Sequence, residues 1–272
     1  LPKGNNLSLH LLELFTSRVA KVGMTDGIRQ VLQEESDALR AYYEQAGILI
    51  ARPAGGTSCR LAISAKGGTN AENHNHNDVG SYAVALGSET MVGDQGGPNS
   101  YPGDYFNGDA PQKYKIKGSF GHPVPVVDGR TQSSGGKAKG VVLQKEFTNE
   151  KDVFSINYTS AYSTPNLDKL IRTFVYDRQG KGSFTVGDEF TAKTPIRFET
   201  AITTRADWKI LDDTHLLLAT DSEQMIVAIE ASGKVAFTSE TIEVNSPAYT
   251  RIGIALKNQS KEGYIRLKMY TK

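Results

Sequence analysis

The period of the hydrophobic pattern changes near residue 47. Up to residue 46, apolar side chains recur every three or four positions, which predicts two short helices separated by the polar and glycine residues of 23–27. Beyond this point, apolar and polar residues alternate in short runs bounded by glycine, a pattern typical of strands. The clearest runs are 47–52, 59–64, 82–86, 90–94, 141–143, 153–156, 171–176, 225–229 and 264–267.

The regular return of these runs indicates the fold class. From residue 124 onward, strand signals recur about every 8 to 12 residues, the spacing found in β-sandwiches. We therefore predict a mainly β protein: a large antiparallel β-sandwich over residues 47–272, preceded by a short N-terminal helical segment over residues 1–46. Residues 95–117 interrupt the pattern with glycine, proline, asparagine and aromatic residues. A loop of this length inside a compact domain usually has a function.

Composition and charge exclude several classes of protein. The 272 residues carry a formal net charge of +1, so no global field attracts nucleic acid. The single cysteine rules out an internal disulfide and a cysteine-rich zinc module. No run approaches the roughly 18 apolar residues of a membrane span. The chain begins at Leu1 with neither an initiator methionine nor a secretory pattern, so we expect a processed chain or part of a longer protein.

The most concentrated chemical signal is residues 73–78, Asn-His-Asn-His-Asn-Asp, which hold two of the five histidines. If this segment is a strand, His74, His76 and Asp78 project from the same face, because residues two apart do so. A row of two imidazoles and a carboxylate is the chemistry of a divalent-metal site. It also suits a site that handles protons and acidic substrates.

A metal needs a third ligand from a neighbouring element. Asp94 ends the strand predicted after the histidine segment, and His122 precedes the first strand after the long loop. His76, Asp94 and His122 would supply two nitrogens and one carboxylate oxygen, which suits zinc with an open position. His74 is then expected to face a substrate, and Asp78 to orient a metal ligand. Alternatively, His-x-His arises by chance and these residues form a hydrogen-bonded structural cluster.

The tyrosines of the long loop also have two interpretations. Tyr101, Tyr105 and Tyr114 either fasten the loop to the sheet or line a sugar-binding groove, where a flat ring packs on a pyranose. Lysines in and after the loop, including Lys113, Lys115 and Lys117, are candidates for pairing with acidic sugars, although scattered bases are usually a solvated face.

Four motifs in order resemble the C-terminal domain of the heparinase II/III-like polysaccharide lyases. They are AGILIAR at 46–52, HNHNDVGSY at 74–82, VGDQGG at 92–97 with the following tyrosine, and GHPVPVVDG at 121–129. The resemblance runs from about residue 46 to the C-terminus, with its motifs in the first half of that range. It implies a two-domain lyase in which an N-terminal α/α toroid packs against a C-terminal antiparallel supersandwich.

The resemblance also implies the chemistry. Such enzymes cleave acidic, uronate-containing polysaccharides such as glycosaminoglycans by β-elimination in the cleft between the domains. The sandwich supplies one structural zinc, whose ligands correspond to His76, Asp94 and His122. It also supplies a substrate-facing histidine, here His74, and a loop tyrosine for which Tyr105 is the first choice and Tyr101 the second. A periplasmic or secreted location follows from the same resemblance.

The sequence departs from the family pattern because residues 1–46 are too few to form a toroid. Since the toroid supplies the main catalytic tyrosine and histidine, we expect this chain alone to be weak or inactive as a lyase. One rival is a non-catalytic carbohydrate-binding or structural β-sandwich with a structural metal. Another is a cupin-like metalloenzyme, but cupins usually place a glutamate a few residues after His-x-His, and residues 77–81 contain none.

Overall fold

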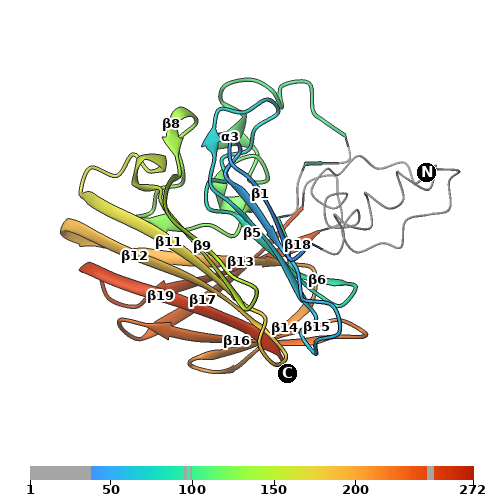
Figure 1. Ribbon diagram of the computed structural model, residues 1–272. Helices are drawn as coiled ribbons and strands as arrows, with labels where there is room; N and C mark the ends of the chain where they lie inside the picture. Colours follow the sequence, from blue (N-terminus) through green and yellow to red (C-terminus); the bar gives the residue numbers. More distant parts are fainter. Residues whose placement is uncertain (1–37, 95–96, 99, 244–247) are drawn as a thin grey trace, which may run out of the picture.

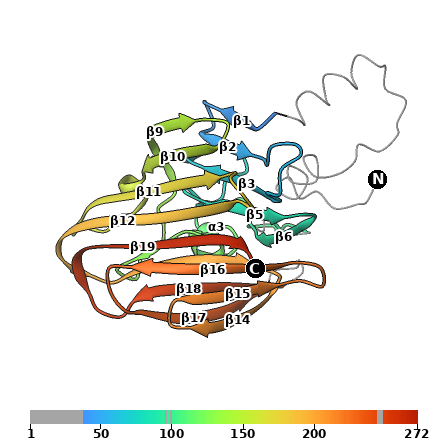
Figure 2. The same cartoon turned by 60° about the horizontal axis from the view of Figure 1, so that its bottom comes forward.

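The computed structural model describes residues 38–272 except 95–96, 99 and 244–247, and it is mostly antiparallel β-sheet (Figure 1). The largest sheet has eight strands in the order β14-β15-β16-β19-β12-β11-β10-β9. Figure 2 shows β12, β19 and β16 side by side at its middle. Its strands are β9 (Val141–Phe147), β10 (Lys151–Asn157), β11 (Leu167–Asp177), β12 (Ser183–Ile196), β14 (Asp207–Asp212), β15 (His215–Ala219), β16 (Gln224–Ala231) and β19 (Ser260–Thr271).

Two smaller sheets form the facing layer. A five-stranded sheet, in the order β1-β2-β3-β5-β6, contains β1 (Arg40–Tyr43), β2 (Ile48–Ala51), β3 (Leu61–Lys66), β5 (Tyr82–Leu86) and β6 (Glu89–Val92). A four-stranded sheet, in the order β17-β18-β13-β7, contains β7 (Val126–Val127), β13 (Phe198–Thr204), β17 (Val235–Ile242) and β18 (Tyr249–Leu256). The short strands β4 (Thr69–Asn70) and β8 (Gly135–Lys139) pair separately. The helical turns are α3 (Ala110–Lys113), η1 (Ser119–Gly121) and η2 (Thr159–Ala161).

The two smaller sheets meet at β6 and β13. The Gly93 amide donates to the Thr203 carbonyl at 3.0 Å, and the Thr204 hydroxyl donates to the Met91 carbonyl at 2.6 Å. These bonds join the end of β6 to β13, so the five- and four-stranded sheets act as one layer against the eight-stranded sheet. The predicted large antiparallel sandwich is confirmed.

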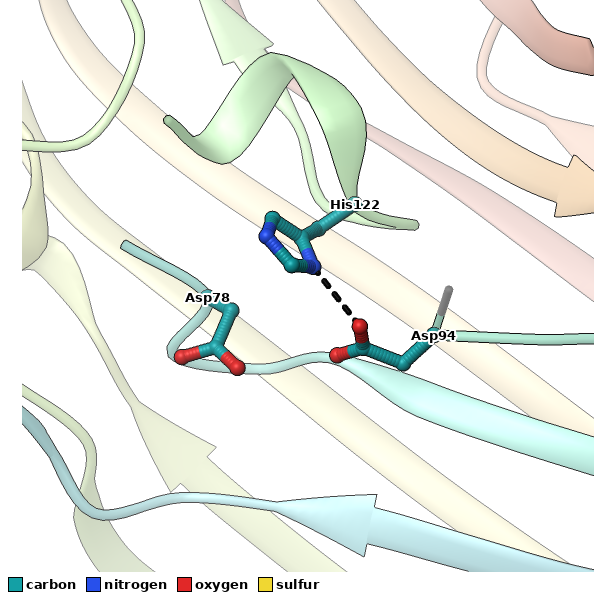
Figure 3. A group of neighbouring side chains, drawn as sticks. All are labelled: Asp78, Asp94 and His122. Carbon is teal, nitrogen blue, oxygen red and sulfur yellow. Dashed lines mark hydrogen bonds and ion pairs between the residues drawn. The ribbon is translucent and has the colours of Figure 1, made fainter. Parts of the chain in front are cut away.

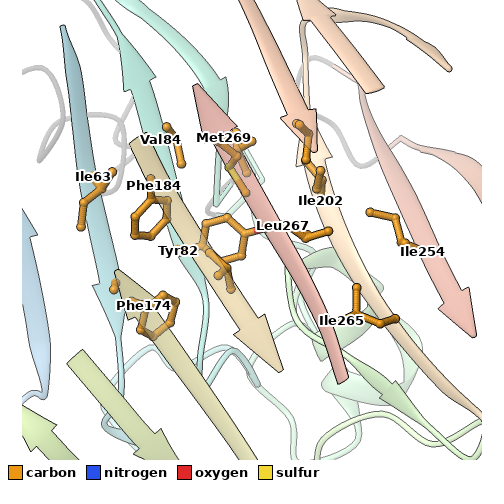
Figure 4. Packing of buried hydrophobic residues seen from close by; sticks show 14 of the residues in the cluster. Ile63, Tyr82, Val84, Phe174, Phe184, Ile202, Ile254, Ile265, Leu267 and Met269 are labelled. Carbon is orange, nitrogen blue, oxygen red and sulfur yellow. The ribbon is translucent and has the colours of Figure 1, made fainter. Parts of the chain in front are cut away.

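Alternation of buried and exposed side chains places the core between the layers. In β3, every second residue from Leu61 is buried, and β11 alternates in the same way from Leu170 onward. Such alternation is expected of strands with one face on the core. Phe174 stacks on Phe184 with ring centroids 6.2 Å apart and lies 6.2 Å from Tyr82 of the opposite layer. Figure 4 shows the core side chains that meet across the layers.

The start of the described chain differs from the expected helical segment. Residues 40–43 form strand β1, which pairs with β2, and only residues 1–37 of that segment lie outside the described residues. Tertiary contacts explain the strand. The ring centroid of Tyr42 lies 5.7 Å from those of Phe147 and Phe154. Nε of Arg40 forms an ion pair with buried Asp152 at 2.8 Å. Among the described residues, no helix is long and apolar enough to cross a membrane.

Candidate metal centre and aromatic loop

The histidine segment is not a strand. Residues 73–78 form turns between β4 and β5, and His74 adopts a left-handed backbone conformation with φ of 56°. The Asn77 amide donates to the Lys117 carbonyl at 2.9 Å, and the Asp78 amide donates to the Asn70 side chain at 3.1 Å. These bonds replace a sheet ladder, so the expected row of side chains on one sheet face is wrong. A strained non-glycine residue is uncommon and often marks a functional position.

Two residues from distant parts of the chain form the centre of the site. Asp94 follows β6, and His122 follows the η1 turn with its side chain fully buried. Nδ1 of His122 lies 2.9 Å from Oδ1 of Asp94, while Nε2 lies 2.9 Å from the Ile116 carbonyl. The Ser81 hydroxyl donates to Oδ2 of Asp94 at 2.6 Å. Each of these two side chains therefore has two hydrogen-bond partners that fix its position.

Asp94 and His122 shift each other's pKa in opposite directions. Burial alone would raise the pKa of Asp94, but the charge and hydrogen bond of His122, together with the bond from Ser81, outweigh it and lower that pKa. Burial alone would lower the pKa of His122, but the Asp94 carboxylate outweighs it and raises that pKa. In the protein without metal, a proton is thus held between the two side chains.

The donor set fits a divalent cation. Side-chain atoms of Asp78, Asp94 and His122 lie within 4.8 Å of one another (Figure 3). Since only Nε2–H of His122 can donate to the Ile116 carbonyl, Nδ1 faces Asp94 and is available once its proton leaves. A metal-ligating histidine usually donates its other N–H to a carbonyl or carboxylate in this way. Asp78 already accepts a hydrogen bond from Lys66 at 2.6 Å, so a metal would compete with an ammonium for it.

His76 lies beside this group but faces elsewhere. Its ring centroid is 5.2 Å from that of His122, and its Nε2 is 3.1 Å from the Tyr105 hydroxyl. Burial, followed by the charge of His122, lowers the pKa of His76 to about 4, so its imidazole is neutral near pH 7 and able to bind a metal. The structure brings His76 close to Asp94 and His122 and adds Asp78 to the possible ligands. The set of His76, Asp94 and His122 stays a prediction.

A buried arginine supports both sides of the site. Nη1 of Arg172 donates to the Gly80 carbonyl at 2.6 Å and to the Pro123 carbonyl at 2.8 Å. Its other nitrogens bind Asp188 in a bidentate ion pair with both side chains at most 1% exposed. Gly80 is next to Ser81, and Pro123 is next to His122, so Arg172 fixes the two backbone segments that carry the centre. In the sequence it appears only as one polar position in a strand, which is why it was missed.

The tyrosines predicted as site residues differ in exposure. They belong to the aromatic loop, residues 100–118, which contains the short helix α3 (Figure 1). Tyr105 is 1% exposed and packs beneath the loop, Tyr114 is half-buried and donates to Asp104, and Tyr101 is 51% exposed. Phe106, which the sequence analysis did not single out, is 52% exposed and lies 5.2 Å from His74. Its only sequence signal was its place in a glycine-rich loop.

Known structures share this fold. A crystal structure of heparinase III has a TM-score of 0.67 at 17% identity, covering 85% of this chain and 36% of that chain. The heparan sulfate lyase of Pedobacter heparinus has a TM-score of 0.69 at 14% identity, covering 89% of this chain and 39% of that one. A second heparinase III has a TM-score of 0.67 at 12% identity, with 89% and 38% covered. No protein-family model matches the sequence, and no curated protein matches it.

These matches confirm the expected likeness to the heparinases, and at such identities they show a shared fold. The chain spans less than two fifths of the length of each of these three solved chains. The larger proteins thus contain much that has no counterpart in these 272 residues.

Proposed function

We propose that this chain is the zinc-binding C-terminal part of a polysaccharide lyase that cleaves uronate-containing polysaccharide by β-elimination. The observation that carries the proposal is buried His122 paired with partly buried Asp94, with neutral His76 beside them and exposed His74 nearby, on a fold shared with heparinase III. A location in the periplasm or outside the cell belongs to the same proposal.

One zinc per chain would be held by His76, Asp94 and His122, with Asp78 next to them. Its contribution is structural: it would fasten the aromatic loop and η1 to the end of β6. Ser81 and the Ile116 carbonyl each form a hydrogen bond to one of these side chains, Asp94 and His122, which supports their assignment as ligands. Asp78, paired with Lys66, is assigned to orient this group rather than to bind the ion.

The chemistry follows from the substrate. A uronate carries a weakly acidic C5 proton beside its carboxylate, and removing it builds negative charge on that carboxylate. In this proposal His74 would neutralise this charge, a case of electrostatic stabilisation of the transition state. A base takes the C5 proton and an acid protonates the leaving glycosidic oxygen, so the C4–O bond breaks and a C4–C5 double bond forms. No water is consumed.

The roles of the tyrosines are unequal. Tyr101 has an exposed ring and can reach a polymer at the surface. Tyr105 is buried and its hydroxyl contacts His76, and burial raises its pKa, so in this arrangement it is a poor base. We therefore assign the main acid and base to an N-terminal toroid domain and expect this chain alone to be weak or inactive.

Metal content is the first test. Elemental analysis of the purified chain should give about one zinc per chain, and none in a His76→Ala, His122→Ala double variant. His74→Ala serves as the matched control and should keep the metal. If His74→Ala lost zinc as fully as the double variant, the assignment of roles would be wrong. Absence of metal from the wild-type chain would leave a polar cluster in a plain β-sandwich.

Activity is the second test. Ultraviolet absorbance of the unsaturated uronate should appear when the full-length protein acts on an acidic polysaccharide, and hardly at all with these 272 residues. Full turnover by this chain alone would refute the division of labour. Zinc and glycan binding without any double-bond formation by the full-length protein would identify a carbohydrate-binding module instead.

A further inference from the structure

Three rings of the site gather at the surface. Phe106 lies 5.1 Å from Tyr101 and 5.2 Å from His74, measured between ring centroids. Tyr101 and Phe106 are each about half exposed, and His74 is exposed as well. We call His74, Tyr101 and Phe106 the aromatic platform.

The platform rests on a fixed base. Tyr105 is 1% exposed, and its ring centroid lies 5.0 Å from that of Tyr101 and 5.4 Å from that of Phe106. Asp104 next to it binds both Lys113 and Tyr114, which closes the loop on itself. Rings that are already held in place lose little conformational entropy when a ligand binds.

A lysine lies directly against these rings. Nζ of Lys117 is 5.0 Å from the ring centroid of Phe106 and 4.8 Å from that of Tyr105, and it donates to the Tyr105 carbonyl. Its side chain is 8% exposed. Burial lowers the pKa of Lys117, as expected of an ammonium without a counter-charge.

The neighbouring lysines form ion pairs with carboxylates, whereas Lys117 forms none with the described residues. Lys113 forms an ion pair with Asp104, Lys115 with Glu240, and Lys66 with Asp78. Within the described part of the chain, no carboxylate lies within ion-pair distance of Lys117. A positive charge in a partly apolar setting attracts an incoming anion more strongly than one in bulk water.

We infer that Phe106 and Lys117 form a subsite for one sugar ring that carries a carboxylate. The apolar face of the sugar packs on Phe106 and Tyr101, and its carboxylate lies toward Lys117 and His74. The inference rests on the proposed function and deepens it, because it names the residues that would recognise the acidic ring before any chemistry occurs.

The test is calorimetric binding of two probes to this chain. One is a hexasaccharide of alternating glucuronate and N-acetylglucosamine, and the other is the same sugar with its carboxyl groups reduced to alcohols. Phe106→Ala should weaken binding of both probes about tenfold, because stacking does not depend on the carboxylate. Tyr43→Ala removes an aromatic side chain of similar exposure on β1 and should leave the affinity for both probes unchanged.

Lys117→Met keeps the length of the stem and removes the charge. It should weaken binding of the acidic probe about tenfold and leave binding of the reduced probe unchanged. The affinity for the acidic probe should then depend less on salt concentration. Lys117→Arg should restore most of the affinity for the acidic probe. Lys115→Met is the matched control: Lys115 belongs to the same loop but pairs with Glu240 outside it, so this variant should bind both probes as the wild type does.

The outcomes separate this inference from the proposed function. Wild-type binding that is unchanged by Phe106→Ala and Lys117→Met overturns the subsite and leaves the lyase proposal standing. A wild-type chain that binds neither probe also overturns the subsite. Equal loss for both probes in Lys117→Met and Lys117→Arg would show a structural role only. If the expected binding pattern appeared in a chain without zinc, and the full-length protein formed no double bond, the subsite would be supported and the lyase proposal overturned.

Discussion

Nδ1 of His122 lies 2.9 Å from Oδ1 of Asp94, and Nε2 of His122 donates to the Ile116 carbonyl. The Asp94 charge outweighs burial and raises the pKa of His122 above its ordinary 6.5, so at pH 6.5 more than half of the chains hold a proton on Nδ1. His76, with a pKa of about 4, is already neutral at that pH. Metal and proton therefore compete at His122 alone.

We predict that zinc binding at pH 6.5 releases between half a proton and one proton per chain. The proton number should fall as the pH rises through the raised pKa of His122, and zinc affinity should weaken as the pH falls, because a histidine ligand must be deprotonated. Calorimetry in two buffers of different ionisation enthalpy measures the proton number. His74→Ala should leave it unchanged, and zinc binding without proton release would contradict the arrangement.

Ser81 gives a second prediction at the scale of one residue. Its hydroxyl donates to Asp94 at 2.6 Å, and Ser81→Ala removes this support without removing a ligand. Loss of such an outer hydrogen bond typically costs about 10- to 100-fold in metal affinity. Competition with a chelator measures this loss. Ser155→Ala, which removes a buried serine bonded to Thr173, is the control and should keep the affinity. An equal affinity in both variants would show that Ser81 has no role in the site.

At the scale of elements, the site depends on loops that Arg172 of β11 joins. Its contacts to Gly80 and Pro123 link the segment after the histidines with the segment after η1. Asp188 of β12, Thr200 of β13 and Tyr158 complete the buried network. The eight-stranded sheet thus positions a site whose proposed ligands all lie outside that sheet.

Arg172→Met should destabilise the protein by about 3 to 5 kcal/mol, because it leaves the Asp188 charge buried without its partner. Urea unfolding measures the loss. Arg266→Met is the control: Arg266 pairs with Glu189 and Glu230 on an exposed face, where each pair contributes about 0 to 1 kcal/mol. Similar losses in the two variants would refute the assigned importance of the buried network.

At the scale of the whole molecule, two layers enclose one continuous core. The eight-stranded sheet covers both smaller sheets, and the joint between β6 and β13 makes those sheets a single face. Phe174, 1% exposed, stacks with Phe154 and Phe184 in its own sheet and contacts Tyr82 of the opposite layer.

Phe174→Ala should therefore destabilise the molecule by about 3 to 5 kcal/mol, the usual cost of removing a buried aromatic ring. Thermal unfolding followed by circular dichroism measures the change. Leu143→Ala, at a side chain 53% exposed on the edge strand β9, should change stability by about 0.5 kcal/mol or less. A mild effect at Phe174 would mean that the layers are not closely packed there.

The sequence by itself determined the strands and the sandwich, because alternation records which face of each strand is buried. Its ordered motifs also selected Asp94 and His122, which the structure places together. Two local predictions were wrong because contacts with distant segments decide those structures. The turn at 73–78 depends on the bond from Asn77 to Lys117, forty residues away along the chain, and β1 depends on contacts with β9 and β10.

Only the tertiary structure decided which side chains meet. Arg172 is one inward position of an alternating strand until folding brings the Gly80 and Pro123 carbonyls to it. Phe106 and Lys117 are an aromatic and a base in a loop until that loop closes over Tyr105. Local periodicity encodes burial, whereas hydrogen bonds and ion pairs between distant segments have no local pattern. That is why the layers could be predicted from the sequence and the complete site could not.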